Sequence, residues 1–521
     1  MNRRLSTLLL PLSALVVALL LALPLSAPAA THAKKDAAAD DAPFAWENAI
    51  IHIEATSKAY NYIQPWERSE HKIFKSGVVI DGHQIITTAD GLADATEIRF
   101  KKDGDGLFTF GRVAWIDYQA NLAALTTDDA LNAQLNPGEP DFWKGLQPAK
   151  LADPVPITGP VRLLRWRDDA LEDRKGDIER LTVENSALSF VSVPALKIDS
   201  NMAGAGYGEA VVADNKLIGL AYEQGGDAIT AVPTSFILPI IKAEQAKTYT
   251  GLGYFDFTWD TVENPLNLQY LGQTPPARGV IIKDTGMKPG AASLVKPRDV
   301  LVSIDGFDLD TEGNYNDPQY KKLSLENLSS RGVFAGQTRK FKILRDGKEM
   351  DLTYTLPRAA FTDELLPEQS FDQAPEYVMA GGLVFVPLSE NYLRSWGPGW
   401  RQRAPFRLTY YDEDKVKPER PQRVILAEVL PNPANIGYEG LRNLVIDEVN
   451  GVKIKRIADI LTALKTPQGD FDVFTFDPGQ SIHQLVLDAT DINQVNEQIM
   501  ARYHIPTDHV LNPDGAPVVD R

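Results

Sequence analysis

Short apolar runs broken by Gly, Asp, Asn and Pro fill the chain between Ile50 and about Leu238. The pair Asp81-Gly82 separates two such runs, and this pattern is typical of a β-hairpin with a tight turn. Many short strands at this spacing predict a sandwich or a barrel rather than alternating strands and helices. The clearest runs are Gly77–Ile80, Gln84–Thr88, Glu97–Phe100 and Leu217–Tyr222.

A second pattern occurs twice in the C-terminal half of the chain. Arg298–Gly306 and Asn443–Gly451 each read as a strand that ends in an Asp-Gly or Asn-Gly turn, with a short apolar strand after it. The second copy continues into Asp459–Lys465, whose apolar residues recur at helical spacing. The first copy closes with the strand and turn of Arg339–Lys348. The repeat predicts two similar β-rich modules in tandem.

The N-terminal residues follow the order of a secretory signal peptide. Arg3 and Arg4 precede an apolar stretch, Leu8–Leu25, and small-residue sites ending at Ala29 and Ala33 come next. We therefore expect cleavage near Ala29 or Ala33 and an exported protein, periplasmic or secreted. The alternative is a leader kept as a membrane anchor, because the apolar stretch is close to the lower limit for spanning a bilayer. No later stretch is apolar enough to span, so no stable membrane span is expected after leader cleavage.

Composition narrows the classes of function. The 521 residues suffice for about three domains beside a leader. Acidic residues number 70 against 53 basic ones, a formal net charge of −17, which argues against a nucleic-acid partner. The chain has no cysteine, which excludes disulfides and thiolate nucleophiles. The histidines are scattered and no phosphate-binding glycine loop follows a strand, so neither a metal nor a cofactor is expected.

The order of these patterns resembles the Deg/HtrA family of serine proteases, in which a trypsin-like domain precedes one or two PDZ domains. Ala380–Glu390 and Asn435–Glu439 are similar to segments of the plant-type Deg branch, which has an elaborated second PDZ domain. The resemblance covers nearly everything after the leader. It implies a mainly β chain: a trypsin-like double β-barrel followed by two PDZ domains, which are β-rich α+β folds. The expected boundaries are 1–33 for the signal peptide, 34–48 for a flexible spacer, 49–245 for the trypsin-like domain, 249–358 for the first PDZ domain, 359–376 for a linker, 377–490 for the second PDZ domain and 491–521 for a C-terminal tail.

The resemblance also locates the positions of a catalytic triad. A trypsin-type site needs a hydroxyl nucleophile, an imidazole that takes its proton, a carboxylate that orients the imidazole, and free backbone N–H groups for the oxyanion. The family places the imidazole at the end of a Leu-Thr-Asn-Ala-His stretch, and the matching Ile86–Asp90 ends in Asp90. The family's carboxylate opens an Asp-Leu-Ala-x-Leu strand, and the matching Asn121–Leu125 opens with Asn121.

The family's nucleophile lies in a Gly-Asn-Ser-Gly-Gly-Pro loop, which Gly204–Glu209 replaces here. Counting back from Gly219 places the serine position on Gly206, whereas counting forward from Asp199 places it on Tyr207. Neither residue is a serine. The resemblance therefore implies a catalytically degenerate member, with all three triad positions replaced.

Other residues of this region form no recognisable substitute triad. His83 lies in the hairpin turn, His71 lies in a loop of mixed charge, and Ser200 is too far from the expected nucleophile turn. A carboxylate mechanism with Asp90 and Asp117 is chemically conceivable, but the spacing gives it no specific support.

Peptide capture is assigned by the resemblance to the PDZ domains. Such domains add an extended polypeptide to a sheet edge and hold its C-terminal carboxylate with backbone N–H groups. The alternative for the carboxylate loop is a plain strand that enters the domain. In the second PDZ domain, Gly381–Phe385 occupies a comparable place, and the resemblance implies that the protein's own segments fill this module. The residues that match the family's carboxylate loop ahead of the first PDZ strand are Gly251, Leu252, Gly253, Tyr254 and Phe255.

The sequence thus predicts a non-catalytic polypeptide-binding protein of the cell envelope, with a scaffold, chaperone-like or regulatory role in protein quality control. Its expected partners are unfolded or C-terminal polypeptide segments. The resemblance implies a homo-oligomer, a trimer or a multiple of one, alone or with an active homologue. The alternative is an active serine endopeptidase of the Deg/HtrA type whose triad lies at other residues.

Overall fold

The computed structural model describes residues 43–102, 108–138, 140–167, 170–286, 294–360, 365–367, 369–397, 399–414, 417 and 419–512. The expected signal peptide, its cleavage sites near Ala29 and Ala33, and most of the expected spacer lie outside these residues. None of the helices in this part of the chain has the length and hydropathy needed to cross a membrane.

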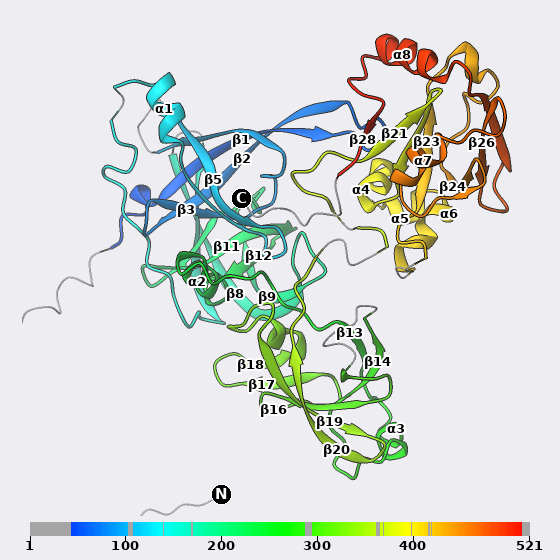
Figure 1. Ribbon diagram of the computed structural model, residues 1–521. Coiled ribbons are helices and arrows are strands. Elements are labelled where there is room, and N and C mark those ends of the chain that lie inside the picture. The colour runs from blue at the N-terminus through cyan, green and yellow to red at the C-terminus, as the bar shows by residue number, and fades with distance from the viewer. Residues whose placement is uncertain are drawn as a thin grey trace, which may run out of the picture. The chain divides into compact units, whose positions relative to one another are not determined.

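Two closed β-barrels form the region between residues 50 and 233 (Figure 1). The first closes in the order β1-β2-β3-β6-β5-β4 and the second in the order β10-β11-β12-β9-β8-β7. Asp81-Gly82 lies in the turn that joins β2 to β3, as the sequence predicted. The strands are β1 (Ile50–Tyr60), β2 (Arg68–Ile80), β3 (Gln84–Thr87), β4 (Ala95–Lys101), β5 (Thr109–Asp117), β6 (Leu122–Thr127), β7 (Gly159–Arg167), β8 (Ala170–Asn185), β9 (Ser192–Ser200), β10 (Ala210–Ala213), β11 (Lys216–Gly225) and β12 (Ala228–Pro233).

Helices are few in the barrel region. A single turn, η1 (Trp46–Asn48), precedes β1, α1 (Asp129–Leu135) follows β6, and α2 (Thr234–Gln245) follows β12. The Asp128 carboxylate caps α1 by accepting from the backbone N–H of Leu131. Apolar side chains of α2, including Ile237 and Ile240, are buried.

A smaller sheet with the strand order β13-β14-β15-β19-β20 follows the barrels. Strand β16 pairs with β15, and β17 and β18 form a separate hairpin. One apolar cluster fills this domain and includes Phe255, Phe341 and Tyr354. The elements are β13 (Phe257–Asp260), α3 (Pro265–Tyr270), β14 (Val280–Thr285), β15 (Val300–Ile304), β16 (Phe307–Asp308), β17 (Asn314–Asp317), β18 (Lys321–Ser324), η3 (Leu325–Ser329), β19 (Thr338–Arg345) and β20 (Lys348–Thr355).

The last sheet has the order β27-β26-β24-β23-β22-β21-β28, with β25 paired to β24. Its elements are β21 (Tyr377–Ala380), β22 (Leu383–Pro387), α4 (Glu390–Leu393), η5 (Arg394–Trp396), α5 (Trp400–Arg403), α6 (Phe406–Thr409), η6 (Tyr410–Glu413), β23 (Val424–Val429), η7 (Pro433–Asn435), β24 (Leu444–Val449), β25 (Val452–Lys453), α7 (Ala458–Ala463), β26 (Phe471–Phe476), β27 (Gln484–Asp488), α8 (Ile492–Tyr503) and β28 (His509–Val510).

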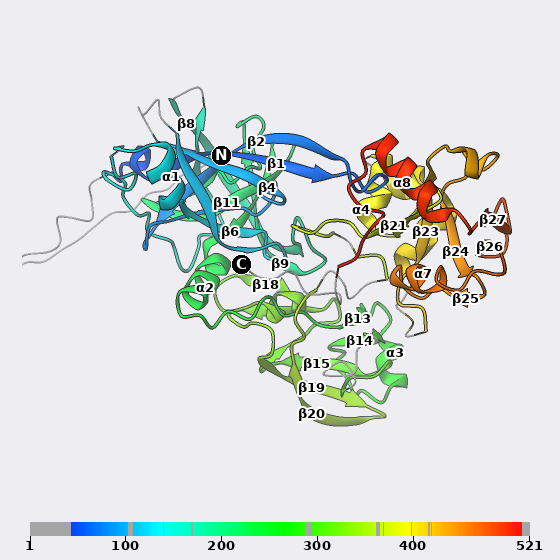
Figure 2. The ribbon, with the colours of Figure 1, turned by 45° about the horizontal axis from the view of Figure 1, so that its top comes forward.

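Both faces of this last sheet are buried. In β22, Leu383 and Phe385 belong to the cluster that contains α7, whereas Val384 and Val386 belong to the cluster that contains α4–α6 and α8. The alternation follows from the period of two along a strand. Helices therefore cover the sheet on its two sides, with α7 and α8 drawn apart in Figure 2.

The sequence repeat reappears as one turn geometry used twice. Asp305 and Gly306 between β15 and β16 have φ angles of 51° and 83°, and Asn450 and Gly451 between β24 and β25 have 52° and 80°. Two successive left-handed residues define the hairpin turn that Asp-Gly and Asn-Gly favour. The segment expected as a C-terminal tail contains α8 and β28, and β28 pairs with β21.

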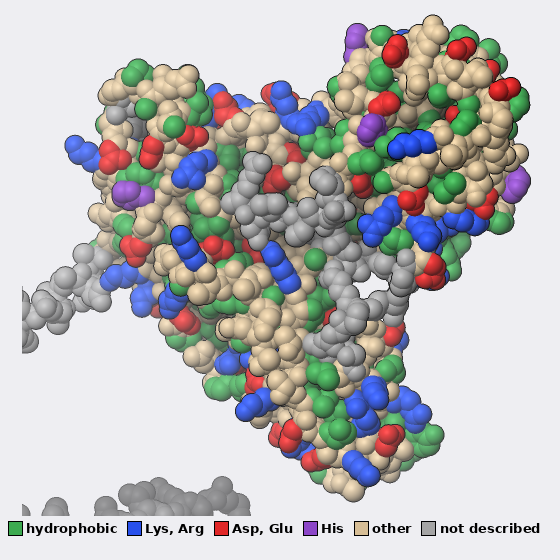
Figure 3. Space-filling view, viewed as in Figure 1, with side chains coloured by type: hydrophobic (Ala, Val, Ile, Leu, Met, Phe, Trp, Pro, Cys, Tyr) green, Lys and Arg blue, Asp and Glu red, His purple; other side chains and the backbone are tan. Residues whose placement is uncertain are grey.

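Acidic and basic side chains are interspersed on the face drawn in Figure 3, over the barrels and the sheets alike. An even mixture of this kind gives no continuous positive track for a phosphate backbone.

Candidate functional site

Asp90 and Asn121 lie side by side in the first barrel. Asp90 follows β3 and Asn121 immediately precedes β6, and the backbone N–H of Asp90 donates to Oδ1 of Asn121 at 2.9 Å. Asn121 is 1% exposed, and its Nδ2 has no hydrogen-bond partner among the described residues. An amide whose oxygen is committed to a backbone N–H offers only N–H donors on its other side. The pair therefore contains no imidazole, and Asn121 has an amide where the family has a carboxylate.

A lysine that sequence reasoning did not single out reaches the same place. Lys75 is 2% exposed, and its Nζ donates to Oγ1 of Thr88 and to the backbone oxygen of Asp90, both at 2.8 Å. Burial lowers the pKa of Lys75 to about 8, and the charges of Asp90 and Glu209 oppose this shift. The site thus carries a buried amino group beside Asp90, the position predicted for the family's general base.

The backbone of the loop Gly204–Glu209 is satisfied by the protein itself. Gly206 and Tyr207 donate their N–H groups to Oε2 of Glu209, each at 2.8 Å. Ala205 donates to Oε1 of Gln224 at 2.8 Å. An oxyanion hole needs N–H groups directed at an empty position. Here three consecutive N–H groups are already directed at side-chain oxygens.

Arg165 fixes the other half of this loop. Its guanidinium donates to the backbone oxygens of Ala203 and Gly204 at 2.7 and 2.8 Å. It also forms ion pairs with Glu172 at 2.8 Å and with Glu209 at 3.4 Å. Glu209 is 2% exposed, so it is a buried charge with a buried partner.

Gly206 and Tyr207, the two predicted positions of the nucleophile, differ in how they are held. The backbone oxygen of Tyr207 accepts from the N–H of Ser76 in β2 at 2.9 Å, and the Tyr207 side chain is 46% exposed. Gly206 has a φ of 120°, and a Cβ there would lie 3.2 Å from the backbone of Glu223. Both assignments stay predictions, and neither residue is a serine.

The other candidate groups have structural partners. His83 stacks on Trp143, with ring centroids 4.9 Å apart and planes at 6°. The Ser200 hydroxyl donates to the backbone oxygen of Lys175 at 2.8 Å. Asp117 accepts from the hydroxyl of Tyr249.

His71 forms the one side-chain pair in this set that a hydrolase could use. Its Nε2 lies 2.9 Å from Oγ of Ser69, and both residues are exposed on β2. No side-chain carboxylate is recorded on the other ring nitrogen within the described residues. The pair therefore lacks the third member that holds a base in register.

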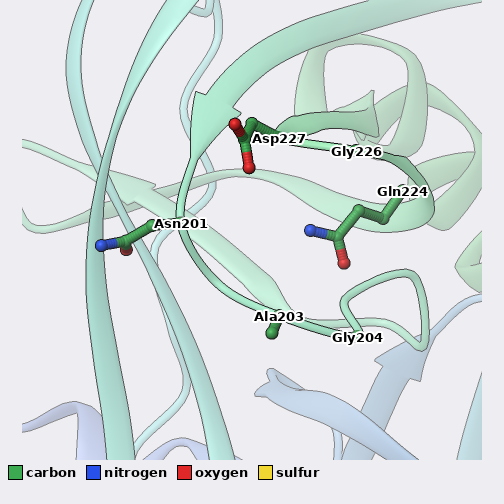
Figure 4. A pocket seen from close by; sticks show the side chains of 6 residues that line it. All are labelled: Asn201, Ala203, Gly204, Gln224, Gly226 and Asp227. Carbon is green, nitrogen blue, oxygen red and sulfur yellow. The ribbon is translucent and has the colours of Figure 1, made fainter.

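A pocket of about 380 Å³ lies beside the loop (Figure 4). The side chain of Gln224 extends among the lining residues, and its Nε2 donates to the backbone oxygen of Met202 at 2.7 Å. Gln224 thus holds the backbone at Met202 and at Ala205, on either side of the lining residues Ala203 and Gly204. The lining residues are Asn201, Ala203, Gly204, Gln224, Gly226 and Asp227.

The predicted carboxylate loop of the first PDZ domain is largely packed into that domain. Leu252 and Phe255 are 1% and 5% exposed, and Tyr254 stacks edge-on against Phe190 at 5.2 Å. Gly251 and Gly253 lie where a Cβ would come within 2.8 Å of the side chains of Arg358 and Leu356. The apolar side chains thus belong to the core or to the boundary with the barrel.

The two sheets differ at the strand that follows this loop. β13 lies at one end of its sheet and pairs with β14 only, within the described part of the chain. β22, which follows Gly381 and Gly382, pairs with β21 on one side and β23 on the other. β28 then covers β21.

Sequence reasoning missed Lys75, Arg165 and Gln224. Lys75 begins the buried half of β2, and Arg165 interrupts the apolar run of β7. A charged residue at an inward position of a strand is the signal that could have identified the first two, because such charges are paired when buried. The described residues hold no group of three His, Asp or Glu side chains that could bind a metal ion.

Comparisons with known proteins agree with this architecture. The family model described as a PDZ domain matches residues 366–511. The chain is 24% identical over 416 residues to the putative mitochondrial protease Do-like 11 of Arabidopsis thaliana, which covers 79% of this chain and 66% of that protein, just under two thirds. It is 25% identical over 487 residues to the chloroplastic protease Do-like 2 of the same plant, which covers 91% of this chain and 77% of that protein.

Among solved structures, the chain is similar to the HtrA-type protease AlgW with a decapeptide. The TM-score is 0.44 at 18% identity, and the match covers 60% of this chain and 95% of that chain. The sequence relatives and the PDZ match together make the chain a Deg/HtrA-type protease homologue with a PDZ domain.

Proposed function

We propose that this Deg/HtrA-type protease homologue binds polypeptide without cutting it, as a scaffold, a chaperone-like holder or a regulatory subunit in protein quality control. The observation that carries the proposal is the set of three hydrogen bonds that Glu209 and Gln224 accept from the N–H groups of residues 205–207. The loop that would hold an oxyanion instead holds the protein's own carboxylate and amide.

The residues assigned to the triad positions do not supply the base and the orienting carboxylate that peptide hydrolysis requires. We assign Asp90 and Asn121 to the positions of the base and its orienting acid from the family motifs, and neither side chain is an imidazole. Loss of a triad member costs a factor of about 10⁴–10⁶ in rate, and loss of an oxyanion donor costs about 10²–10³. With all these groups replaced, residual turnover is negligible on a cellular timescale.

The first PDZ domain offers a strand edge to which a polypeptide can bind. β13 has a free edge in the described sheet, and an extended chain can add there as a further strand. The Trp259 indole N–H on β13 donates to Oε1 of Glu326 on η3 at 2.7 Å, so this strand and the short helix lie beside each other. Gly251–Phe255, which leads into β13, remains the proposed carboxylate loop.

In the second PDZ domain we propose that the protein's own strands take the place of a peptide. β21 and β28 lie on the side of β22 opposite to β23. This supports a role in assembly rather than in ligand capture. We also propose export of the mature protein after cleavage near Ala29 or Ala33, and assembly into trimers or multiples of them; copurification with a catalytic homologue would identify a regulatory subunit.

The test is one incubation of the purified mature protein with a chemically unfolded client, read in two ways. Light scattering should show slower aggregation of the client, and mass spectrometry should show that the client stays intact. Client fragments that disappear on Ser69→Ala or His71→Ala substitution would contradict the proposal and identify an active endopeptidase. Unchanged aggregation with an intact client would remove the binding role.

A further inference from the structure

The linker ahead of β21 contacts the first barrel through one aromatic ring. Phe371 is 7% exposed and belongs to the buried cluster of that barrel. Its ring stacks on Tyr118, with centroids 4.0 Å apart and planes at 11°. The preceding residue, Ser370, accepts from the hydroxyl of Tyr62 at 3.3 Å through its backbone oxygen. A linker residue thus packs as part of a domain core that is far away in sequence.

The next residue adds a second anchor. Asp372 accepts from the backbone N–H of Asp94 at 2.7 Å through Oδ1 and from the Tyr118 hydroxyl at 2.6 Å through Oδ2. Two donors from different loops therefore hold the two oxygens of one carboxylate. Burial and the charge of Asp372 raise the pKa of Asp94 to about 6 and the pKa of Tyr118 above its usual value.

This two-point slot adjoins the former catalytic positions. Asp94 follows Asp90 by four residues, and the backbone oxygen of Tyr118 accepts from the N–H of Asn121 at 3.2 Å. The cluster around Phe371 also contains Leu188 from the second barrel, and the neighbouring Ser189 donates to the side chain of Gln119. The slot therefore lies where the two barrels meet, beside Asp90 and Asn121.

We propose that this slot, formed by the Tyr118 ring and hydroxyl and the Asp94 N–H, binds a polypeptide segment with an aromatic residue followed by an acidic residue. Phe371-Asp372 fills it in cis, and an unfolded client with the same pair of side chains takes it when the linker leaves. The ring selects the aromatic side chain by stacking, and the two donors select a carboxylate at the next position. The backbone N–H of Asp94 and the Tyr118 hydroxyl both donate to the carboxylate at that position, so its loss would remove two hydrogen bonds.

Because Phe371-Asp372 of the same chain occupies the slot, it lowers the apparent affinity of the slot for a client. A short tether gives its ligand an effective concentration of about a millimolar, so a free peptide competes against a largely occupied slot. Removal of the tethered ring should raise the apparent affinity of a free peptide by roughly tenfold or more. The inference rests on the proposed function only in that the slot binds the segment and does not cut it.

The experiment uses the full chain and a fluorescent peptide with the sequence of residues 369–376, Gln-Ser-Phe-Asp-Gln-Ala-Pro-Glu. Fluorescence anisotropy should show weak binding to the natural chain and to the control Ser370→Ala, and binding at least tenfold tighter to Phe371→Ala. Adding Tyr118→Phe to Phe371→Ala should weaken this binding about tenfold, because the ring remains and one donor is lost. A peptide with Phe and Asp exchanged should not compete.

Equal affinity of the natural chain and Phe371→Ala for this peptide would overturn the proposal, provided that near-ultraviolet circular dichroism shows both chains folded. If Phe371→Ala is unfolded, Asp372→Asn replaces it, and the same increase is required. Hydrogen exchange gives a second readout: the peptide should protect the amides of residues 91–95 and 117–121. Mass spectrometry of the peptide separates the two claims, because tight binding with an intact peptide supports both, whereas tight binding with cleavage supports the slot and contradicts the proposed function.

Discussion

The loop Gly204–Glu209 and strand β13 are both places where a protein of this architecture uses backbone N–H groups to hold a polypeptide. In the loop, the protein's own Glu209 and Gln224 accept from those groups. In the sheet, β13 is paired by β14 on one side and, in the described residues, by no strand on the other. The difference is that the backbone N–H groups of the loop are already hydrogen-bonded within the protein, whereas one edge of the sheet is open in the described residues.

Loss of the hydrogen bonds that Glu209 accepts from the loop should have the largest effect on the stability of the protein. Glu209→Ala leaves the buried Arg165 without one partner and two N–H groups without acceptors, so we expect a loss of about 3–5 kcal/mol in barrel stability. Urea unfolding followed by hydrogen exchange of the barrel strands measures it. Glu223→Ala, an exposed position on β11, is the matched control and should change stability by less than about 0.5 kcal/mol. A similar small loss for Glu209→Ala would show that the loop is not held by this carboxylate.

The buried lysine beside the loop should make stability depend on pH. The pKa of Lys75 is about 8 in the folded chain and 10.5 in its ordinary state, so the unfolded chain binds more protons between these values. Stability should therefore rise as the pH increases from about 8 towards 10, by at most about 1.4 kcal/mol per pH unit, and the burial penalty is complete below pH 8. Unfolding curves at several pH values should show this slope in the natural chain and a flatter one in Lys75→Met. Identical slopes would show that burial does not lower the pKa of Lys75 in the folded chain.

The open edge is tested by proline. Thr258→Pro in β13 introduces a proline ring into the edge strand and disrupts its extended backbone, so the affinity for an unfolded client should fall by about tenfold. Thr353→Pro in β20 places the same change on the opposite edge of the same sheet and should leave affinity within about twofold. Light scattering at a series of chain concentrations provides both affinities. Equal losses in the two variants would refute β13 as the binding edge.

Removal of β28, which covers one edge of the second PDZ domain, should have the smallest effect of the changes considered. Deletion of residues 509–521 removes β28 and leaves β21 as the end strand. An unpaired strand edge invites pairing with another chain, so we expect self-association to increase by a few fold. Light scattering coupled to size-exclusion chromatography should detect this as a concentration-dependent mass. An unchanged mass would indicate that β28 does not protect the edge.

Local sequence signals explain why the fold could be predicted from the sequence. The Asp-Gly and Asn-Gly turns at 305–306 and 450–451 fix hairpin geometry within a few residues, and the short apolar runs predicted strands that the barrels contain. Asp90 and Asn121 were paired on the basis of family motifs, and the structure brings them into hydrogen-bond contact.

Contacts between side chains that are far apart in the sequence could not be predicted in the same way. Arg165 and Glu209 are 44 positions apart, and Tyr118 and Asp372 are 254 positions apart. A strand pattern shows that a charge is inward, but it does not specify which distant carboxylate pairs with it. The linker ring of Phe371 looked like any apolar residue in a connecting segment until the fold placed it on Tyr118.

The central claim, that the chain binds polypeptide and does not hydrolyse it, is tested most directly with a fluorophosphonate probe on the purified mature protein. An active trypsin-type protease serves as the positive control, and casein cleavage is followed in the same samples. We expect no labelled serine and intact casein. Labelling of any serine, with casein cleavage that disappears when that serine becomes alanine, would instead establish a working protease.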